Sequence, residues 1–398
     1  MNILVLTGTY PQPDDGVVSA TYTVQYFCEQ WVKEGHNVLV IHNSSKFPKI
    51  YYYIVGNFSQ KLAAKVGFNI PNIQSCKKIE RNEKGVTVFR IPMLKIIPHS
   101  VFLKKQITSQ VKQIVDILGK NKFEPDVMIS HWVNPQLDLL LELKKIYPVR
   151  TSLVFHGDCN EANIHKHNIR IKINEIDAIG CRSLSYAKEV QKRLGLSKLP
   201  FVCYSGIPDN LISEKVDYRK YKKHFVYVGR LVKYKNVDAI IKALNIAFPD
   251  RNYLLDIIGS GGEFNNLKQL AKEFGIENNI CFHGQLSRDK VFEIIKKAEC
   301  FTMISDNEVF GMVYIEAMAM GCITIASKGG GVDGVIVDGE NGFLCQEGNY
   351  SELAEIYRKI DSMTDDEKNL LSKKAIKTAS NYTDSKIAKM YLNNVLEW

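Results

Sequence analysis

The segment ISDNEVFGMVYIEAMAMGCITIAS, residues 304–327, carries two glutamates, Glu308 and Glu316, on either side of a Phe310-Gly311 pair. Glu316 lies among residues that are apolar on nearly every side, which predicts a buried helix. A carboxylate in a buried helix is costly unless another group pairs with it or donates hydrogen bonds to it. An apolar strand-like stretch, residues 323–326, follows. The segment therefore predicts a strand–helix–strand unit with an acid that needs a partner.

Short apolar strands alternate with helical patterns on both sides of this segment, which predicts parallel sheets covered by helices. The length of 398 residues suits two such domains. A polar, charged stretch at residues 213–223 resembles a linker. In sheets of this kind ligands bind beyond the carboxyl ends of the strands. The expected strands are residues 3–6, 38–41, 86–89, 126–130, 152–155, 178–181 and 201–204 before the linker, and 225–228, 254–258, 280–282, 300–304 and 323–326 after it.

The composition is that of an ordinary soluble globular protein, with 45% hydrophobic and 24% charged residues. The N-terminus lacks the pattern of a signal peptide, and no stretch reaches about 18 apolar residues, so no membrane span is expected. Nine cysteines, an odd number without a Cys-x-x-Cys pair, predict reduced thiols in a cytoplasm rather than disulfides or a zinc site.

Positive charge is concentrated in residues 44–122. The formal net charge of the whole chain is +9, whereas this segment has fifteen Lys and Arg against three acids, which makes it +12. Aromatic residues, including the tyrosines at 51–53, are interleaved with these cations. This combination favours an anionic membrane surface or an anionic lipid-linked ligand. Single-stranded nucleic acid is the alternative that the same pattern allows.

Several residues of the second half are placed to bind an anion. Arg230 and Lys235 follow the strand at 225–228, where both cations can neutralise a diphosphate. A helix that starts at Phe310 would offer free N–H groups to a phosphate. Glu308 either complements the dipole of that helix or accepts hydrogen bonds from sugar hydroxyls. Between Glu308 and Glu316, eight helical residues cover about 12 Å, which is comparable to a diphosphate with a sugar on each side.

The first half offers a glycine-containing loop and two histidines. Gly16 lies in the loop at residues 10–22, where it lets the backbone approach a phosphate. His131 and His156 each follow a predicted strand, and two histidines at neighbouring strand ends indicate a site. No His-Glu-x-x-His, Gly-x-Ser-x-Gly or Walker motif is present, so no metal site is predicted.

Together these motifs resemble the retaining nucleotide-sugar glycosyltransferases of family 4, which have the GT-B architecture. Residues 304–327 look like the Glu-x7-Glu signature of that family, and YVGRLVKYKNVD, IGSGGE, FHGQLS, GENGFL and FHGD are supporting matches. The resemblance implies an α/β fold with two Rossmann-like doubly wound domains that face a cleft. Residues 1–205 would form the acceptor-binding domain, 206–380 the nucleotide-sugar-binding domain, and 381–398 a helix that packs back on the first domain.

The resemblance also implies a role for each matching residue. Glu316 would bind the ribose, and Glu308 the transferred sugar. Arg230 and Lys235 would hold the diphosphate, and His156 would lie near the reaction centre. The expected catalytic residues are thus Glu308, His156, Arg230 and Lys235. The other donor-binding residues would be Gly16, Val17, Gly259, Gln285, Leu286, Phe310, Gly311, Met312, Val313 and Glu316, with no metal and no cofactor besides the donor.

The expected function is retaining, metal-independent transfer of a hexose from a nucleotide sugar, with UDP favoured over GDP. The acceptor would be a lipid-linked saccharide in the synthesis of a bacterial-type surface polysaccharide such as capsule or O-antigen. The enzyme would be cytoplasmic and would bind the inner face of the cell membrane through residues 44–122, with no nucleic acid partner. The alternatives are a glycosyltransferase with a soluble acceptor and a non-catalytic nucleotide-sugar-binding protein.

Overall fold

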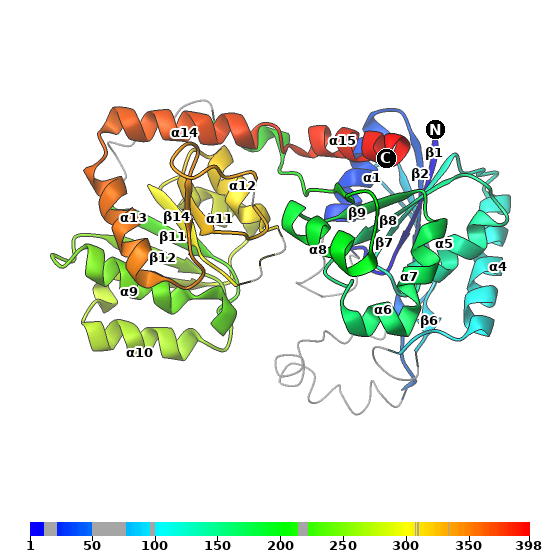
Figure 1. Cartoon of the computed structure of the whole chain (residues 1–398), viewed down its shortest axis with the longest axis horizontal. Coiled ribbons are helices and arrows are strands. Elements are labelled where there is room, and N and C mark those ends of the chain that lie inside the picture. The colour runs from blue at the N-terminus through cyan, green and yellow to red at the C-terminus, as the bar shows by residue number, and fades with distance from the viewer. Residues whose placement is uncertain are drawn as a thin grey trace. The chain divides into compact units, whose positions relative to one another are not determined.

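Two α/β units make up the chain, which we describe from a computed structural model (Figure 1). The structure describes residues 1–11, 22–49, 77–95, 100–213, 222–306, 308, 310–332 and 334–398. The first unit comprises Met1–Arg182, Tyr186–Cys203 and Ile387–Trp398, and the second comprises Ser183–Ser185 and Tyr204–Lys386. The main division follows Cys203, two residues before the boundary expected at 205.

The first unit is built on an eight-stranded sheet in the order β10-β9-β8-β7-β1-β2-β5-β4. All neighbours are parallel except β4 and β5, which form an antiparallel pair that the apolar pattern did not predict. Strand β4 has polar side chains at nearly every position, which suits an edge strand. The strands are β1 (Asn2–Thr7), β2 (Asn37–His42), β4 (Ile79–Glu83), β5 (Val86–Arg90), β7 (Val127–His131), β8 (Arg150–Phe155), β9 (Ala178–Cys181) and β10 (Phe201–Val202), and β3 (Ser45–Lys46) pairs separately with β6 (Met93–Leu94).

The helices of this unit bury apolar side chains against the sheet. They are α1 (Thr23–Lys33), α4 (Lys104–Lys120), α5 (Gln136–Lys144), α6 (Glu161–His167), α7 (Ile169–Lys172), from Tyr186 onward α8 (Leu184–Leu194) and, from Ile387 onward, α15 (Asp384–Glu397). Helix α15 packs beside α1: Trp31 Nε1 donates to the Ala388 carbonyl at 2.9 Å, and the rings of Phe27 and Tyr391 are 5.0 Å apart. The last helix is therefore part of the first unit's core.

The second unit has a six-stranded, fully parallel sheet in the order β13-β12-β11-β14-β15-β16. The chain adds β12 and β13 on one side of β11 and then continues on its other side with β14, so the strand order reverses between β11 and β14. Crevices at such a reversal are where open α/β sheets bind ligands. The strands are β11 (His224–Val228), β12 (Leu254–Ile258), β13 (Ile280–Gly284), β14 (Cys300–Met303), β15 (Ile323–Ser327) and β16 (Phe343–Cys345).

Helices cover this sheet and include the one that carries Glu316. They are α9 (Val237–Ala247), α10 (Phe264–Phe274), α11 (Arg288–Ile295), α12 (Met312–Ala319), α13 (Tyr350–Ser362) and α14 (Asp365–Ala379). In α12 every residue from Tyr314 to the last is buried, as its apolar sequence predicts. Among the described residues, no helix is both long and apolar enough to cross a membrane.

Candidate active site

A lysine–glutamate pair lies where the strand order of the second unit reverses. Lys235 is in the short 3-10 helix η5 (Lys233–Lys235) after β11, and its ammonium donates a hydrogen bond to Glu308, which follows β14. The side chains are 12% and 17% exposed, so the pair is mostly shielded from water. Asn236 fixes the two loops together, because its side-chain amide donates to Asp306 at 2.7 Å and to the Ile304 carbonyl at 2.9 Å. Glu308 thus faces a cation from the neighbouring strand end.

Arg230 is the second predicted cation of this region, two residues after β11. Its side chain is exposed, and within the described part of the chain it forms no ion pair. Its backbone is fixed, because its carbonyl accepts a hydrogen bond of 2.9 Å from the Tyr227 hydroxyl. An exposed guanidinium on an anchored backbone is free to bind an anionic ligand.

Two glycines let the loops after β11 and β12 approach each other closely. Gly259 has φ +138°, and a Cβ on it would lie 1.8 Å from the Gly229 carbonyl oxygen. A Cβ on Gly261 would lie 2.1 Å from the Leu231 carbonyl oxygen. Backbone hydrogen bonds from Leu231 to Ser260 and from Gly259 to Gly284 join these strand ends. Gly259 therefore has a packing role that is sufficient to explain its presence.

The first turn of α12 offers backbone N–H groups to a ligand. Gly311 caps the helix in the left-handed region with φ +71°. The Phe310 side chain is only 4% exposed and lies against the core, so this residue can offer a ligand little beyond its backbone. Met312 and Val313 are partly exposed, and their N–H groups are in the first turn, where no intrahelical acceptor is available.

Glu316 is paired with Arg288, a residue that the sequence reasoning missed. The Glu316 side chain is buried, and its Oε1 accepts from Arg288 Nη2 at 2.6 Å and from Nε at 3.2 Å. Burial raises the pKa of Glu316, while the Arg288 guanidinium opposes this rise. Arg288 begins α11, directly after the predicted base-binding segment with the exposed Gln285 and the partly buried Leu286. The position of Arg288 so close to Gln285 and Leu286 in the sequence is the signal that could have identified this partner of Glu316.

His131 and His156, two histidines of the first unit that follow neighbouring strands, lie together, as their places at the strand ends predict. His131 Nδ1 and His156 Nε2 share a hydrogen bond of 2.9 Å, and the His156 ring stacks on Trp132 at 4.0 Å between centroids. Burial lowers the pKa of both imidazoles, to about 3 for His131. The partly exposed His156 is therefore a neutral imidazole near pH 7.

A polar cavity of about 260 Å³ lies at the same end of the first sheet. Its lining includes Asn43, Lys95, Trp132 and Asp158. Asp158 accepts hydrogen bonds from the backbone N–H of Val133 at 2.6 Å and of His156 at 2.9 Å. The cavity can thus offer donors and acceptors to a polyhydroxylated ligand.

Two predictions lie outside the described residues. Gly16 and Val17 are among them, as are residues 50–76 and 96–99 of the basic segment 44–122. The structure therefore gives no geometry for the expected contact of the first loop with phosphate.

The chain has two doubly wound units, with paired acids and cations at the strand-order reversal of the second unit, and this architecture is that of the GT-B fold. Residues 209–381, most of the second unit, match the family model described as glycosyl transferases group 1. An uncharacterised glycosyltransferase of Methanocaldococcus jannaschii is 26% identical over 324 residues, which are 77% of this chain and 85% of that protein.

Solved structures share the fold along the whole chain. An Anabaena protein solved in complex with UDP and glucose has a TM-score of 0.67 and 17% identity, with 100% of both chains covered. The apo form of a lipopolysaccharide outer core galactosyltransferase has a TM-score of 0.69 and 18% identity, with 100% of this chain and 99% of that chain covered. At these identities the likeness shows the GT-B fold.

Proposed function

We propose that this protein is a retaining, metal-independent hexosyltransferase that uses a UDP-sugar. The observation that carries the proposal is the placement of two acid–cation pairs, Glu308–Lys235 and Glu316–Arg288, on the loops and helices that follow the strands of the second unit. In this proposal Glu316 binds the ribose and Glu308 binds the transferred sugar, as the family resemblance implies. The UDP complex of the Anabaena neighbour supports UDP as the nucleotide.

The two cations after β11 account for stabilisation of the leaving group. As the bond from the anomeric carbon to the diphosphate oxygen breaks, its electron pair stays on that oxygen. Arg230 and Lys235 stabilise the new charge more strongly in the transition state than in the bound donor, which accelerates the reaction. Donor binding transfers Lys235 from Glu308 to phosphate and frees that carboxylate for sugar hydroxyls.

The acceptor attacks the anomeric carbon on the same face of the sugar from which the diphosphate departs, as the family resemblance implies. The acceptor oxygen forms the new bond to the anomeric carbon, and its proton passes to the departing phosphate. The neutral His156 lies near the donor sugar and the reaction centre in this scheme, and the polar cavity of the first unit belongs to its acceptor side. The base of the donor contacts Gln285 and Leu286. Along the donor lie Gly259 and the backbone of Phe310, Gly311, Met312 and Val313. Its phosphates are approached by Gly16 and Val17.

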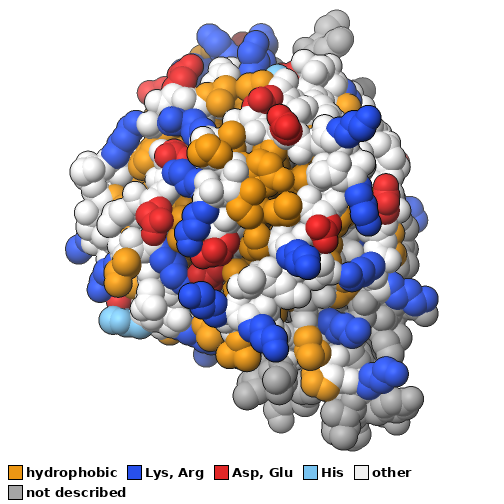
Figure 2. Space-filling view, turned by 90° about the vertical axis from the view of Figure 1, so that its right-hand side faces the viewer, with side chains coloured by type: hydrophobic (Ala, Val, Ile, Leu, Met, Phe, Trp, Pro, Cys, Tyr) orange, Lys and Arg blue, Asp and Glu red, His pale blue; other side chains and the backbone are white. Residues whose placement is uncertain are grey.

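We further propose a lipid-linked saccharide acceptor at an anionic membrane surface. The face of the first unit in Figure 2 has hydrophobic side chains at its centre, with Lys, Arg, Asp and Glu around them. A cavity of about 400 Å³ in this unit is lined by apolar residues such as Phe102 and Leu141, by lysines such as Lys104 and Lys145, and by the acids Asp138, Glu142 and Glu175. The net charge of +12 on residues 44–122 suits anionic lipids, and the lipopolysaccharide galactosyltransferase with the same fold supports an acceptor in surface polysaccharide assembly.

The donor site is tested by Glu316→Gln, with Glu340→Gln as the control because Glu340 is an exposed acid of the same unit. A hydrogen bond to a charged group contributes about 1.5–3 kcal/mol, so we expect roughly 10- to 100-fold weaker UDP binding by calorimetry for Glu316→Gln. The control should bind UDP like the parent. Equal affinities in all three proteins would contradict the assignment.

The reaction itself is tested by a panel of UDP- and GDP-sugars with lipid-linked and soluble saccharides, in the presence of EDTA. We expect transfer from a UDP-sugar to a lipid-linked acceptor. NMR should show that the product has the donor's anomeric configuration. The protein should also bind anionic vesicles at low salt. Preference for a soluble acceptor would contradict the acceptor class. Loss of transfer in EDTA would contradict metal independence.

A further inference from the structure

Four side chains that can bind metals lie on one face of the second unit's sheet, apart from the donor-site pairs. They come from three adjacent strands: His224 from β11, Asp256 from β12, and Cys281 and His283 from β13. Asp256 and Cys281 are direct neighbours in the parallel register. Cys281 and His283 are two residues apart, so both project to the same side of β13, which is the edge strand.

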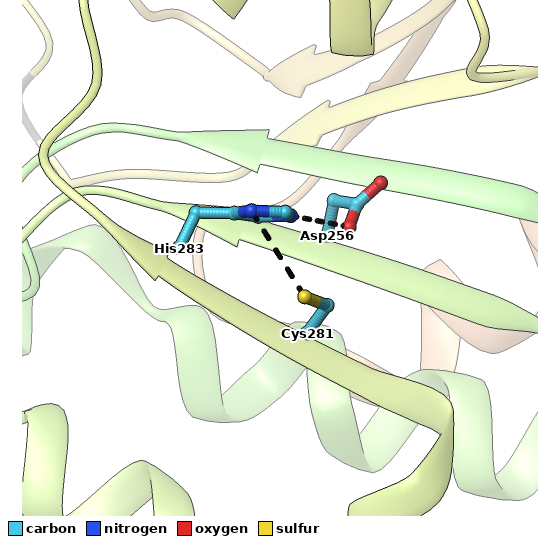
Figure 3. A group of neighbouring side chains, drawn as sticks. All are labelled: Asp256, Cys281 and His283. Carbon is cyan, nitrogen blue, oxygen red and sulfur yellow. Dashed lines mark hydrogen bonds and ion pairs between the residues drawn. The ribbon is translucent and has the colours of Figure 1, made fainter.

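The carboxylate of Asp256 holds both imidazoles. Its Oδ2 is 2.6 Å from His224 Nε2, and its Oδ1 is 2.6 Å from His283 Nε2. A carboxylate only accepts hydrogen bonds, so each of these ring nitrogens must carry the proton. In the neutral form of His283, Nδ1 is then the nitrogen with a free lone pair. Figure 3 shows this ring between Asp256 on one side and Cys281 on the other.

The free nitrogen faces a sulfur at a distance that suits a shared metal ion. His283 Nδ1 and Cys281 Sγ are 3.9 Å apart. Zinc lies about 2.0 Å from nitrogen and about 2.3 Å from sulfur, so a tetrahedral site places those ligands about 3.5 Å apart. A small side-chain rotation closes the difference. One potential ligand atom from each of Asp256, Cys281 and His283 lies within 4.8 Å of the others.

The contact between Asp256 and His283 is the second feature of a metal site. Histidines that bind metals usually donate their other ring N–H to a carboxylate, which fixes the ring and its tautomer. Asp256 does this for His283, and the bond from His224 fixes Asp256 in turn. Cys281 is exposed and the His283 side chain is 25% exposed, so water can complete the coordination.

We propose that Cys281 and His283 bind a thiophilic divalent cation such as Zn²⁺, with Asp256 as the residue that orients His283. The ion would fix the edge strand β13, whose last residue, Gly284, accepts a hydrogen bond from Gly259 beside the donor loops. Transfer chemistry does not pass through this ion. The proposal is therefore independent of the proposed function.

Cysteine labelling gives a direct test, because Cys281 is exposed while the other seven described cysteines are buried. Cys76 lies outside the described residues, so the test uses a Cys76→Ser background. The full-length protein is treated with EDTA, freed of chelator, and alkylated with iodoacetamide with and without Zn²⁺. We expect Zn²⁺ to slow alkylation at Cys281 at least about tenfold in a saturable way, and equilibrium dialysis to give one ion per chain.

Variants separate a ligand from an orienting residue. His283→Gln should abolish protection by Zn²⁺, whereas Asp256→Asn should weaken Zn²⁺ affinity by about 10- to 100-fold. His165→Gln, a change at an exposed histidine in α6 of the other unit, should leave protection unchanged. Circular dichroism checks that each variant is folded.

Two outcomes would overturn the proposal. Alkylation that Zn²⁺ does not slow, including fast alkylation of a thiol activated by His283, would show that no ion is bound. Equal protection in the parent and in His283→Gln would place the ion elsewhere. Donor binding and transfer in EDTA, measured separately, report only on the proposed function.

Discussion

Glu316 is a buried acid that is stabilised by a cation and can still accept hydrogen bonds from a ligand. Arg288 Nε and Nη2 both donate to the same carboxylate oxygen of Glu316, Oε1. The second oxygen, Oε2, is the one that can accept from ribose hydroxyls. At this site burial favours the protonated acid and the guanidinium favours the ionised one. Arg288 therefore acts on the donor through Glu316.

Arg288→Gln should make UDP binding more sensitive to acid. Without the guanidinium, burial raises the pKa of Glu316 further, so the carboxylate is lost at a higher pH as the solution is acidified. We expect roughly tenfold weaker UDP binding at pH 7 and a midpoint of binding that moves to higher pH. Calorimetric titrations between pH 5 and pH 8 measure both effects.

Arg358→Gln is the control for this change, because Arg358 is an exposed arginine on α13 of the same unit. It should reproduce the parent's pH profile. If Arg288→Gln also did so, Arg288 would not control the ionisation of Glu316.

At the scale of elements, the close approach of the loops after β11 and β12 depends on glycine. Gly259→Ala should destabilise the second unit by about 1–3 kcal/mol, because its Cβ overlaps the Gly229 carbonyl oxygen. Gly262→Ala is the matched control, since nothing lies within 4 Å of a Cβ there. Urea unfolding followed by circular dichroism measures both changes. Equal midpoints for the two variants would show that the loops move apart without cost.

Helix α15 contributes to the core of the first unit through Tyr391. Its fully buried ring contacts Phe27, Trp31 and His131, and its hydroxyl is 3.2 Å from His131 Nε2. Tyr391→Ala should cost about 3–5 kcal/mol of unfolding free energy, as for other large aromatic truncations. Leu396→Ala, at a side chain that is 39% exposed, should change it by less than about 0.5 kcal/mol. Urea unfolding followed by tryptophan fluorescence tests this, and similar losses for both would argue against the packing of α15.

At the scale of the whole molecule, the first unit should lose stability in acid. Burial lowers the pKa of two histidines of the first unit, His42 and His131, to about 3, and Arg90 adds to this effect at His42 and Arg182 at His131. Their folded pKa is below the unfolded value, so their contribution to stability is present above about pH 6.5 and is lost as pH falls toward 3. Each histidine lowers the free energy of unfolding by about 1.4 kcal/mol for each pH unit of acidification within that window.

All three tryptophans, Trp31, Trp132 and Trp398, belong to the first unit, so their fluorescence reports its unfolding alone. We expect urea unfolding by fluorescence to show the acid-dependent loss between pH 6.5 and pH 4.5. His42→Gln should reduce its slope by about 1.4 kcal/mol per pH unit, because one titrating group is removed. An unchanged slope in that variant would contradict the assignment to buried histidines.

The sequence by itself determined the features that depend on near neighbours along the chain. Alternating apolar strands and helices predicted the α/β class, and the apolar residues on nearly every side of Glu316 predicted the burial of α12. Turn glycines and strand ends located Arg230, Lys235 and Glu308, because a strand end is where a short apolar stretch stops. These patterns extend over only a few residues, so they can be recognised in the sequence alone.

Only the tertiary structure decided which distant residues meet. The antiparallel edge strand β4 has no apolar pattern, so its place follows from pairing with β5. Glu316 meets Arg288, and Asp256 meets His224 and His283, across 27 to 32 positions of sequence. These contacts depend on the order in which parallel strands lie side by side, which local periodicity does not encode. The buried acid of residues 304–327 has its partner because α11 starts beside α12.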